Sequence, residues 1–252
     1  MIDHRTAIRL VVGVKYIASV SFGKDSLAML LLLIEKKYPL DYVVFYDTGM
    51  EYDAIYRIRD RMRAVLDELD IGYEELRPAE PFWISMLVRK SKYRNKEGYH
   101  YGYSWCGGAC RWGTRNKLSA INRFKKSLGD EVTEYVGIAF DEPDRAKKAR
   151  SEGKELPLVD WCVTEAECLV YCRDHGFTWE EDGTDLYEIL DRVSCWCCRN
   201  KNLKELKSIY EYLPKYWDRL KGLEYRLGEP MKGEGKSLLD LEARFEAEKK
   251  HI

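Results

Sequence analysis

The chain has 252 residues, of which 45% are hydrophobic and 34% are charged, and this length suffices for one full α/β core with a smaller appended part. Its 42 basic and 43 acidic side chains give a net charge of −1, which excludes a global electrostatic attraction to nucleic acid. No apolar run approaches the roughly 18 residues of a membrane span, and residues 1–14 lack the order and length of a signal peptide. We therefore expect a cytoplasmic protein that has no membrane partner.

The first half of the sequence alternates between β-prone runs and helical patterns. Residues 16–20 and 42–46 are rich in β-branched and aromatic residues, and residues 73–76 form a third candidate strand. Residues 27–36 are mainly strong helix formers, and residues 54–69 carry apolar side chains at helical spacing. Alternating strands and helices are typical of a parallel sheet, so the sequence predicts an α/β fold whose twisted sheet is covered by helices on both faces.

A basic, aromatic and glycine-rich stretch at residues 90–113 interrupts this alternation. We interpret it as an inserted functional loop, because long irregular segments inside a regular fold usually carry function. A basic helix is expected over residues 116–128 and a further strand over residues 134–140. Residues 1–153 are therefore assigned to one α/β domain that contains the insertion.

The remaining residues, 154–252, change to a mainly helical pattern. Thr164 and Glu167 form a capping arrangement at the start of one helix. Residues 203–220 are expected to form another helix, and Ser237 is expected to cap a final one. We predict a smaller, mainly helical C-terminal part that also carries the second of two cysteine clusters.

The first predicted strand runs directly into a polar loop that opens the first helix; the loop comprises Ser21, Phe22, Gly23, Lys24, Asp25 and Ser26. Such a turn directs free backbone N–H groups and the positive end of the helix dipole at one point, where an anion is the natural ligand. Gly23 permits a close backbone approach, and Lys24 adds a point charge. The loop is not a Walker A motif, because Ala18 and Asp25 stand where that motif requires glycine and serine or threonine. The alternative is an ordinary tight turn before a capped helix.

The loop sequence SFGKDS resembles the PP-loop of ATP pyrophosphatases. Residues 46–53 (YDTGMEYD) resemble the second-strand element of the phosphoadenosine phosphosulfate (PAPS) reductase branch of that superfamily. Residues 136–148 and 157–161 resemble later segments of the same branch, so the matches run in order over residues 17–223. The resemblance implies an adenine nucleotide α-hydrolase-like fold that binds ATP or a sulfonucleotide together with Mg²⁺.

The same resemblance implies roles for single residues. Ser21–Ser26 would hold the nucleotide phosphates, with Lys24 and Asp25 as the candidate catalytic residues. Further nucleotide contacts would come from Asp47, Thr48, Gly49 and Arg145. Arg145 would be a second cation for phosphate or sulfate, and a solvated turn charge is the alternative interpretation of this residue.

The eight cysteines are expected to be thiols, metal ligands or redox groups, because a reducing compartment does not favour disulfides. Two close pairs stand out, Cys106 with Cys110 and Cys195 with Cys198. Brought together, four thiolates would bind Zn²⁺ or a [4Fe–4S] cluster, and the spacing does not choose between them. The alternative is that these cysteines are small loop residues or buried hydrophobic residues.

The segment around the second pair, SCWCCRNKNLKEL, resembles the C-W-x-C-P segment of phage and bacterial PAPS-reductase-like proteins, with Arg199 in place of the proline. A proline there would stiffen the turn without binding metal, so the departure leaves the predicted metal site in place. Cys197 is expected to point elsewhere. Cys168 and Cys172 are spaced one helical turn apart, and core packing is the preferred interpretation for them and for Cys162.

Three functions remain open at this stage. The first is a PP-loop enzyme that cleaves ATP between its α and β phosphates and adenylates an acceptor before sulfur transfer. The second is a PAPS or adenosine phosphosulfate (APS) reductase, although the last cysteine, Cys198, is followed by 54 residues (252 − 198) without the usual C-terminal nucleophile. The third is a non-catalytic, metal-dependent module in which residues 90–96 and nearby aromatic residues bind RNA or DNA. The oligomeric state is left open.

Overall fold

The computed structural model describes residues 13–93, 95–106 and 110–249. The chain divides into two compact units, which interleave along the sequence. The first comprises residues 1–47, 53–77 and 117–178, and the second comprises residues 48–52, 78–116 and 179–252. Among the described residues, no helix is both long and apolar enough to cross a membrane. Residues 1–12, which carry most of the segment tested above for a signal peptide, lie outside the described residues.

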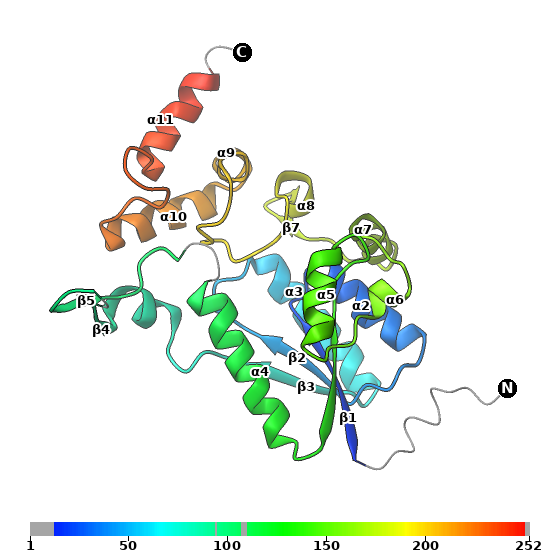
Figure 1. Ribbon diagram of the computed structural model, residues 1–252. Coiled ribbons are helices and arrows are strands. Elements are labelled where there is room, and N and C mark those ends of the chain that lie inside the picture. The colour runs from blue at the N-terminus through cyan, green and yellow to red at the C-terminus, as the bar shows by residue number, and fades with distance from the viewer. Residues whose placement is uncertain (1–12, 94, 107–109, 250–252) are drawn as a thin grey trace. The chain divides into compact units, whose positions relative to one another are not determined.

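The first unit is built on four parallel strands, β1 (Val14–Val20), β2 (Tyr42–Tyr46), β3 (Gly72–Leu76) and β6 (Glu131–Val136). Their order in the sheet is β3-β2-β1-β6 (Figure 1). The chain therefore moves outward from β1 to β3 and then crosses to the other side of β1. In open parallel sheets, ligands bind beyond the carboxyl ends of the strands at the point where this direction reverses. Here that point lies between β1 and β6.

Helices cover both faces of this sheet, as predicted. Successive side chains of β1 point to opposite faces. Ile17 packs with Val44 and with Ile121 of α4 (Asn116–Ser127) on one face. On the other face Tyr16 stacks on Tyr135, which meets Tyr38 beyond the end of α2 (Lys24–Glu35).

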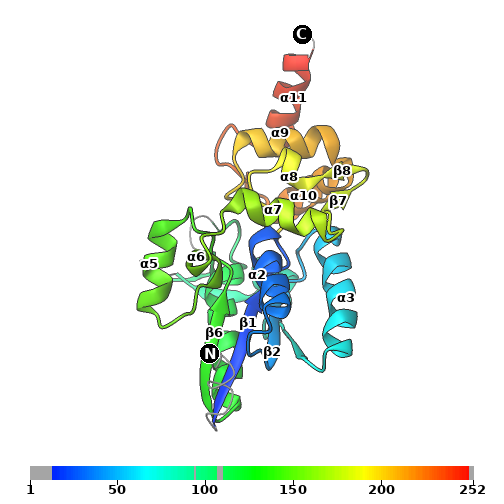
Figure 2. The same cartoon turned by 90° about the vertical axis from the view of Figure 1, so that its right-hand side faces the viewer.

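Among the described residues, the first unit contains four more helices: α3 (Asp53–Glu68), α5 (Pro143–Ser151), α6 (Pro157–Asp160) and α7 (Glu165–Asp174). Helix α7 packs along α2 (Figure 2). It begins with the predicted capping box, in which Thr164 and Glu167 each accept a hydrogen bond from the other's backbone N–H. Strand β6 starts three residues before the predicted 134–140 and stops at Val136, before Gly137 meets α2.

The second unit is mainly helical and contains two small antiparallel hairpins. The first hairpin, β4 (Lys90–Lys92) with β5 (Tyr99–Tyr101), lies between two π-helical turns, η1 (Ile84–Val88) and η2 (Arg111–Arg115). The second consists of β7 (Glu180–Glu181) and β8 (Thr184–Asp185). The helices are α8 (Leu186–Ile189), α9 (Leu203–Tyr212), α10 (Pro214–Leu227) and α11 (Leu238–Lys249).

Two helix predictions in this unit have clear outcomes. The helix predicted over residues 203–220 is two helices, because Pro214 occupies the first position of α10 and cannot continue α9. Ser237 caps α11 as predicted, since its hydroxyl accepts the N–H of Asp240 at 3.1 Å.

The two compact units also differ from the single boundary predicted after residue 153, because residues 78–116 group with the C-terminal helices and α7 groups with the sheet.

Candidate functional site

The loop after β1 is held in one conformation by a buried aromatic ring. Phe22 adopts a left-handed backbone conformation (φ 56°), which is costly for a bulky residue and persists only where packing enforces it. Its side chain is fully buried and its ring lies 5.1 Å from that of Phe45 on β2. The predicted loop is therefore part of the core of the first unit.

The two serines of the loop close it onto the first turn of α2. Ser26 Oγ accepts the N–H of Ser21 at 3.1 Å and lies 3.1 Å from the carbonyl oxygen of Gly23. The two serine hydroxyls are 3.2 Å apart. Gly23 is the N-cap of α2 and provides no side-chain cap. The first turn of this 12-residue helix thus presents its N–H groups beside two hydroxyls, which is an arrangement suited to a phosphate.

Gly137, which follows β6, approaches this loop more closely than a residue with a side chain could. A Cβ at Gly137 would lie 2.6 Å from Ser26 Cα and 2.9 Å from Ser26 N. The backbone after β6 therefore lies directly against the start of α2, at the reversal point of the sheet. Sequence reasoning missed this residue, and the available signal was a glycine in the middle of the strand predicted over residues 134–140.

Lys24 does not present a free charge in this structure. Its side chain is buried, and Nζ lies 2.7 Å from Asp25 Oδ1 and 2.6 Å from Oε2 of Glu165, the first residue of α7. Burial lowers the pKa of Lys24, but the hydrogen bonds to these two carboxylates outweigh it and raise the pKa overall. Burial raises the pKa of Asp25, and the Lys24 ammonium opposes that shift. Glu165 is a second residue that the sequence did not identify.

Two cysteines of α7 pack beneath this charged group. Cys168 and Cys172 are fully buried, and Cys172 Sγ lies 3.4 Å from the carbonyl oxygen of Lys24. Burial raises the pKa of Cys168, and it raises the pKa of Cys172 to about 12. Both thiols are therefore protonated at neutral pH. Their positions agree with the preferred interpretation as core residues that support the loop. The same interpretation was wrong for Cys162, which is exposed because it lies in the turn before α7.

The other predicted nucleotide contacts are distributed over both units. Asp47, at the end of β2 in the first unit, is buried and accepts a 2.8 Å hydrogen bond from Tyr56. Arg145 lies on α5, is exposed and pairs with Glu142. Thr48 and Gly49 belong to the second unit. The hydroxyl of Thr48 donates to Glu51 at 2.8 Å, so this side chain is already bound within its own unit.

The second unit contains a cavity of about 320 Å³ on which both predicted cysteine pairs converge. Its walls include the sulfur-bearing residues Cys106, Cys110, Cys195, Cys197 and Cys198, and the aromatic residues Phe82, Trp105 and Trp112. The two pairs are separated by 85 residues in sequence (195 − 110). The four cysteines that spacing selected thus line one cavity. Cys197 was expected to point elsewhere but lines the same cavity.

The thiols in this cavity differ in their acidity. The Cys106 thiol hydrogen-bonds to Cys110 and lowers the pKa of Cys110 to about 6, helped by the N–H groups of Gly113 and Trp112. Burial instead raises the pKa of Cys195. Cys195 Sγ lies 3.5 Å from both Thr48 Oγ1 and Glu51 Oε1.

A buried cation accompanies the cysteines. Lys201 is 2% exposed, and its Nζ donates to Ser194, a wall residue of the cavity, at 3.3 Å. Within the described part of the chain, no carboxylate lies within 4.0 Å of this ammonium. Burial lowers the pKa of Lys201, and Glu205 and the nearby cysteine thiolates offset this shift only in part. A buried lysine is costly without an anion, so a negative charge on the sulfur atoms would reduce that cost, although burial raises the pKa values of Cys195 and Cys197.

The thiols around the cavity are the donor type that binds Zn²⁺ or an iron–sulfur cluster, and Lys201 could balance thiolate charge. The described thiols are not arranged as a coordination shell in this structure. Among the described residues, no three Cys, His, Asp or Glu side chains stand at metal-binding geometry. Residues 107–109, which connect Cys106 to Cys110, lie outside the described residues. The metal site therefore stays a prediction.

Comparison with known proteins identifies the family. The model of the phosphoadenosine phosphosulfate reductase domain matches residues 15–175. The chain belongs to this family. The match contains the loop after β1, Gly137, Glu165 and the first cysteine pair, and it ends before the second pair. The chain is also similar to an uncharacterized protein of Methanocaldococcus jannaschii, with 26% identity over 212 residues. That alignment covers 79% of this chain and 39% of the archaeal protein, so the chain spans well under half of that relative's length.

The acidities of the thiols in this PAPS reductase domain protein give a first testable prediction. Because the thiolate is the nucleophile, iodoacetamide at pH 7 should modify Cys110 in the metal-free, reduced protein, with a rate that falls as the pH drops below about 6. Cys168 and Cys172 should stay unmodified until the protein unfolds. Peptide mapping by mass spectrometry measures this, with the exposed Cys162 as the reference for an accessible thiol. Modification of Cys168 or Cys172 in the folded protein at the rate of Cys162 would contradict these assignments.

Proposed function

We propose that this protein is a PP-loop enzyme that binds ATP at Ser21–Ser26, cleaves it between the α and β phosphates and adenylates an acceptor before sulfur transfer. The observation that supports this proposal is the position of the loop. It combines a helix N-terminus that has no side-chain cap, two hydroxyls and a close glycine, Gly137, at the reversal point of a parallel sheet. Members of the family act on nucleotides, and this geometry offers donors to several phosphate oxygens at once.

Lys24 and Asp25 have the central roles in this proposal. On binding, phosphate oxygens compete with Asp25 and Glu165 for the Lys24 ammonium, which then stabilises the negative charge that develops on the departing pyrophosphate. The two carboxylates hold the ammonium at the loop when no phosphate is bound. Mg²⁺, bound with the nucleotide, would supply further neutralisation of phosphate charge. Asp47 and Arg145 stay candidate contacts to the rest of the nucleotide.

The second part of the proposal concerns the cavity that both cysteine pairs line. Cys106, Cys110, Cys195 and Cys198 would hold Zn²⁺ or a [4Fe–4S] cluster, whose thiolate ligands would place negative charge beside the buried Lys201. An iron–sulfur cluster would add redox chemistry or a sulfide site for sulfur transfer, and zinc would add structural stability. In either case these residues bind the metal, and the neighbouring aromatic side chains keep water from it.

Metal content tests this part of the proposal. Protein purified without oxygen should contain zinc, or iron with a broad absorbance near 400 nm, and Cys195→Ser should lower the bound metal at least several-fold because one of four ligands is lost. Cys162→Ser, at an exposed position outside the cavity, is the matched control and should retain the full metal content. Equal metal loss in both variants, or no metal in the wild-type protein, would contradict the proposed site.

A sulfonucleotide reductase is the second candidate function, and the Cys106–Cys110 pair favours it. A thiol with a pKa near 6 that is hydrogen-bonded to a second thiol is suited to attack on sulfur followed by disulfide formation. In that reaction the Cys110 thiolate would displace adenosine 3′,5′-bisphosphate from PAPS, and Cys106 would then release sulfite. In the reductase, Cys106 and Cys110 would form a redox pair, whereas the first proposal assigns them to a metal.

Product analysis separates the two functions. The protein is incubated in parallel with ATP and Mg²⁺, and with PAPS and a dithiol reductant. The proposed function predicts AMP and pyrophosphate from ATP in equal amounts, with water as a slow substitute acceptor, and no sulfite from PAPS. Sulfite without pyrophosphate would establish the reductase instead, and ADP with inorganic phosphate would contradict both.

A further inference from the structure

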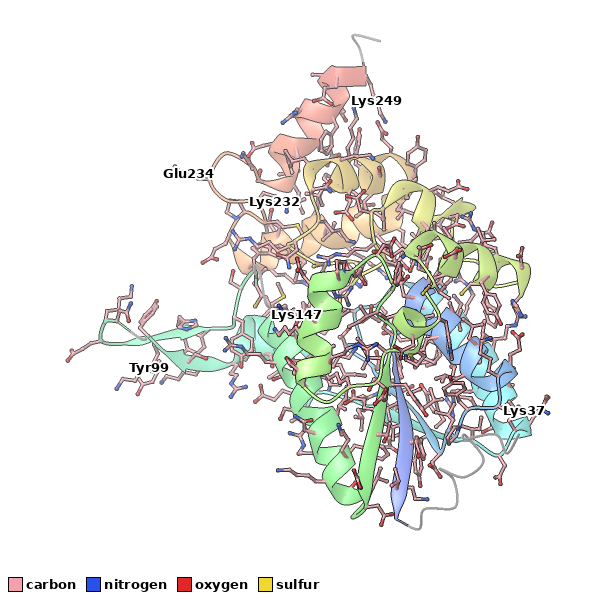
Figure 3. All side chains as sticks on the ribbon, turned by 45° about the vertical axis from the view of Figure 1, so that its right-hand side comes forward. Lys37, Tyr99, Lys147, Lys232, Glu234 and Lys249 are labelled. Atoms are coloured by element: carbon pink, nitrogen blue, oxygen red, sulfur yellow. The ribbon has the colours of Figure 1, made fainter. Side chains whose placement is uncertain are left out.

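The hairpin formed by β4 and β5 presents an unusual exposed face. The strands pair so that Lys90 lies opposite Tyr101, and Lys92 lies opposite Tyr99. Because side chains alternate along a strand, these four share one face, and all four are exposed. Tyr99 is 56% and Tyr101 is 66% exposed. The hairpin extends away from the helices of the second unit, with Tyr99 among its projecting side chains (Figure 3).

Backbone hydrogen bonds hold the base of this hairpin in place, so its exposed face has a defined structure. The N–H of Gly102, directly after β5, donates to Arg89 O at 2.8 Å, and Tyr103 N–H donates to Ser85 O at 3.0 Å. Gly102 has a φ of +68°, and a Cβ there would lie 1.8 Å from Met86 O. Only glycine fits this approach. The hairpin is therefore anchored on the η1 turn, which is part of the same unit.

The lysine charges on the hairpin are not neutralised by any of the described residues. Arg89 at its base pairs with Glu80 at 3.2 Å. In contrast, Lys90, Lys92 and Lys96 have no carboxylate within 4.0 Å among the residues that the structure describes. Lys90 Nζ lies 4.4 Å from the centre of the Tyr99 ring, and Lys96 Nζ lies 4.1 Å from that of Tyr93. Cations held beside exposed rings form a surface that is complementary to a ligand with both anionic and aromatic groups.

We propose that this hairpin face binds single-stranded nucleic acid, with bases stacked on Tyr99 and Tyr101 and phosphates paired with Lys90 and Lys92. The two tyrosines are two residues apart on one strand, which separates them by about 6.6–6.8 Å. This is about twice the 3.4 Å rise per nucleotide of one strand, so the rings match bases that are two nucleotides apart in a stacked strand. Stacking of this kind tolerates any base, because every base has a flat aromatic face.

The chemistry of the face favours this ligand over an acidic peptide. A peptide of Asp and Glu would use the lysines and leave both tyrosine rings in water, whereas a single strand uses both kinds of group. A duplex hides the faces of its bases and would contact only the lysines. This inference goes beyond the proposed function, and it does not depend on which nucleotide the first unit binds.

Fluorescence anisotropy of labelled twelve-nucleotide single strands, one of uniform deoxythymidine and one of uniform uridine, tests the proposal. At 50 mM salt the wild-type protein should bind at least one strand tenfold more tightly than a duplex of equal length and than an acidic peptide of equal charge. The double substitution Tyr99→Ala with Tyr101→Ala should weaken binding at least tenfold, since both stacking contacts are lost. Comparison of the two strands distinguishes DNA from RNA.

Matched controls isolate the two contributions. Tyr225→Ala removes an 89% exposed tyrosine from α10 in the same unit and should leave the affinity unchanged. Lys90→Ala with Lys92→Ala should reduce the slope of log affinity against log salt by about 1.4, which is 0.7 for each lost phosphate contact. Wild-type affinity in the Tyr99/Tyr101 variant, absence of binding by the wild-type protein, or tighter binding of the duplex or the peptide would overturn the proposal.

Discussion

Lys24→Met is expected to weaken binding of the non-cleavable nucleotide α,β-methylene-ATP, measured with Mg²⁺ by isothermal titration calorimetry, about 10- to 100-fold. The ammonium is the one cationic side chain within the Ser21–Ser26 loop, and a hydrogen bond to a charged group contributes about 1.5–3 kcal/mol. Methionine keeps the buried aliphatic stem and so limits the change to the loss of charge.

Glu165→Gln is the control for this substitution. Glutamine retains the size of the side chain but removes one of the two carboxylates that hold the Lys24 ammonium. Because phosphate oxygens then compete with one carboxylate instead of two, the affinity for the nucleotide should stay equal or rise. An equal loss of affinity in both variants would indicate that the Lys24–Glu165 ion pair is structural and that Lys24 does not bind phosphate.

Gly137→Ala is expected to have the largest combined effect on stability and binding. The added Cβ would stand 2.6 Å from Ser26 Cα, so either β6 or the start of α2 must move. Overpacking of this kind costs about 1–3 kcal/mol, and the displaced backbone is the one that carries the phosphate-binding N–H groups. We expect a lower midpoint of thermal unfolding and loss of nucleotide affinity at temperatures where the variant is still folded.

Gly222→Ala provides the comparison, because a Cβ at Gly222 in α10 would meet no atom within 4 Å. Alanine is the better helix former by about 1 kcal/mol, so this variant should be as stable as the wild-type protein or more stable, with unchanged nucleotide affinity. A Gly137→Ala protein that binds nucleotide with wild-type affinity would show that the contact between β6 and α2 does not shape the site.

The regular elements of the sheet were predictable because their signals are local. Strand composition at residues 42–46 and helical spacing at residues 54–69 each act within a single element, and both elements formed within a few residues of the predicted bounds. Capping residues such as Thr164 and Ser237 were predictable for the same reason. The break at Pro214 was also a local signal, which the apolar pattern on either side of it obscured.

The partners inside the site were not predictable, since they are distant in sequence. Glu165 meets Lys24 across 141 residues, and Gly137 meets Ser26 only because β6 crosses to the other side of β1. The cysteine pairs are an intermediate case. Their spacing selected the residues that line one cavity, but nothing local indicated that Lys201 would be buried beside them.

Hydrogen–deuterium exchange with and without saturating α,β-methylene-ATP and Mg²⁺ tests the central claim, that the loop from Ser21 to Ser26 holds the nucleotide phosphates. If the claim is correct, the amides of the loop and of the first turn of α2 exchange more slowly in the presence of the nucleotide, because they donate to phosphate oxygens. At a nucleotide concentration equal to the wild-type Kd, the same peptides should show clearly less protection in Lys24→Met, because its affinity is about 10- to 100-fold lower. Unchanged exchange at residues 21–28 together with protection elsewhere in the chain would contradict the assignment.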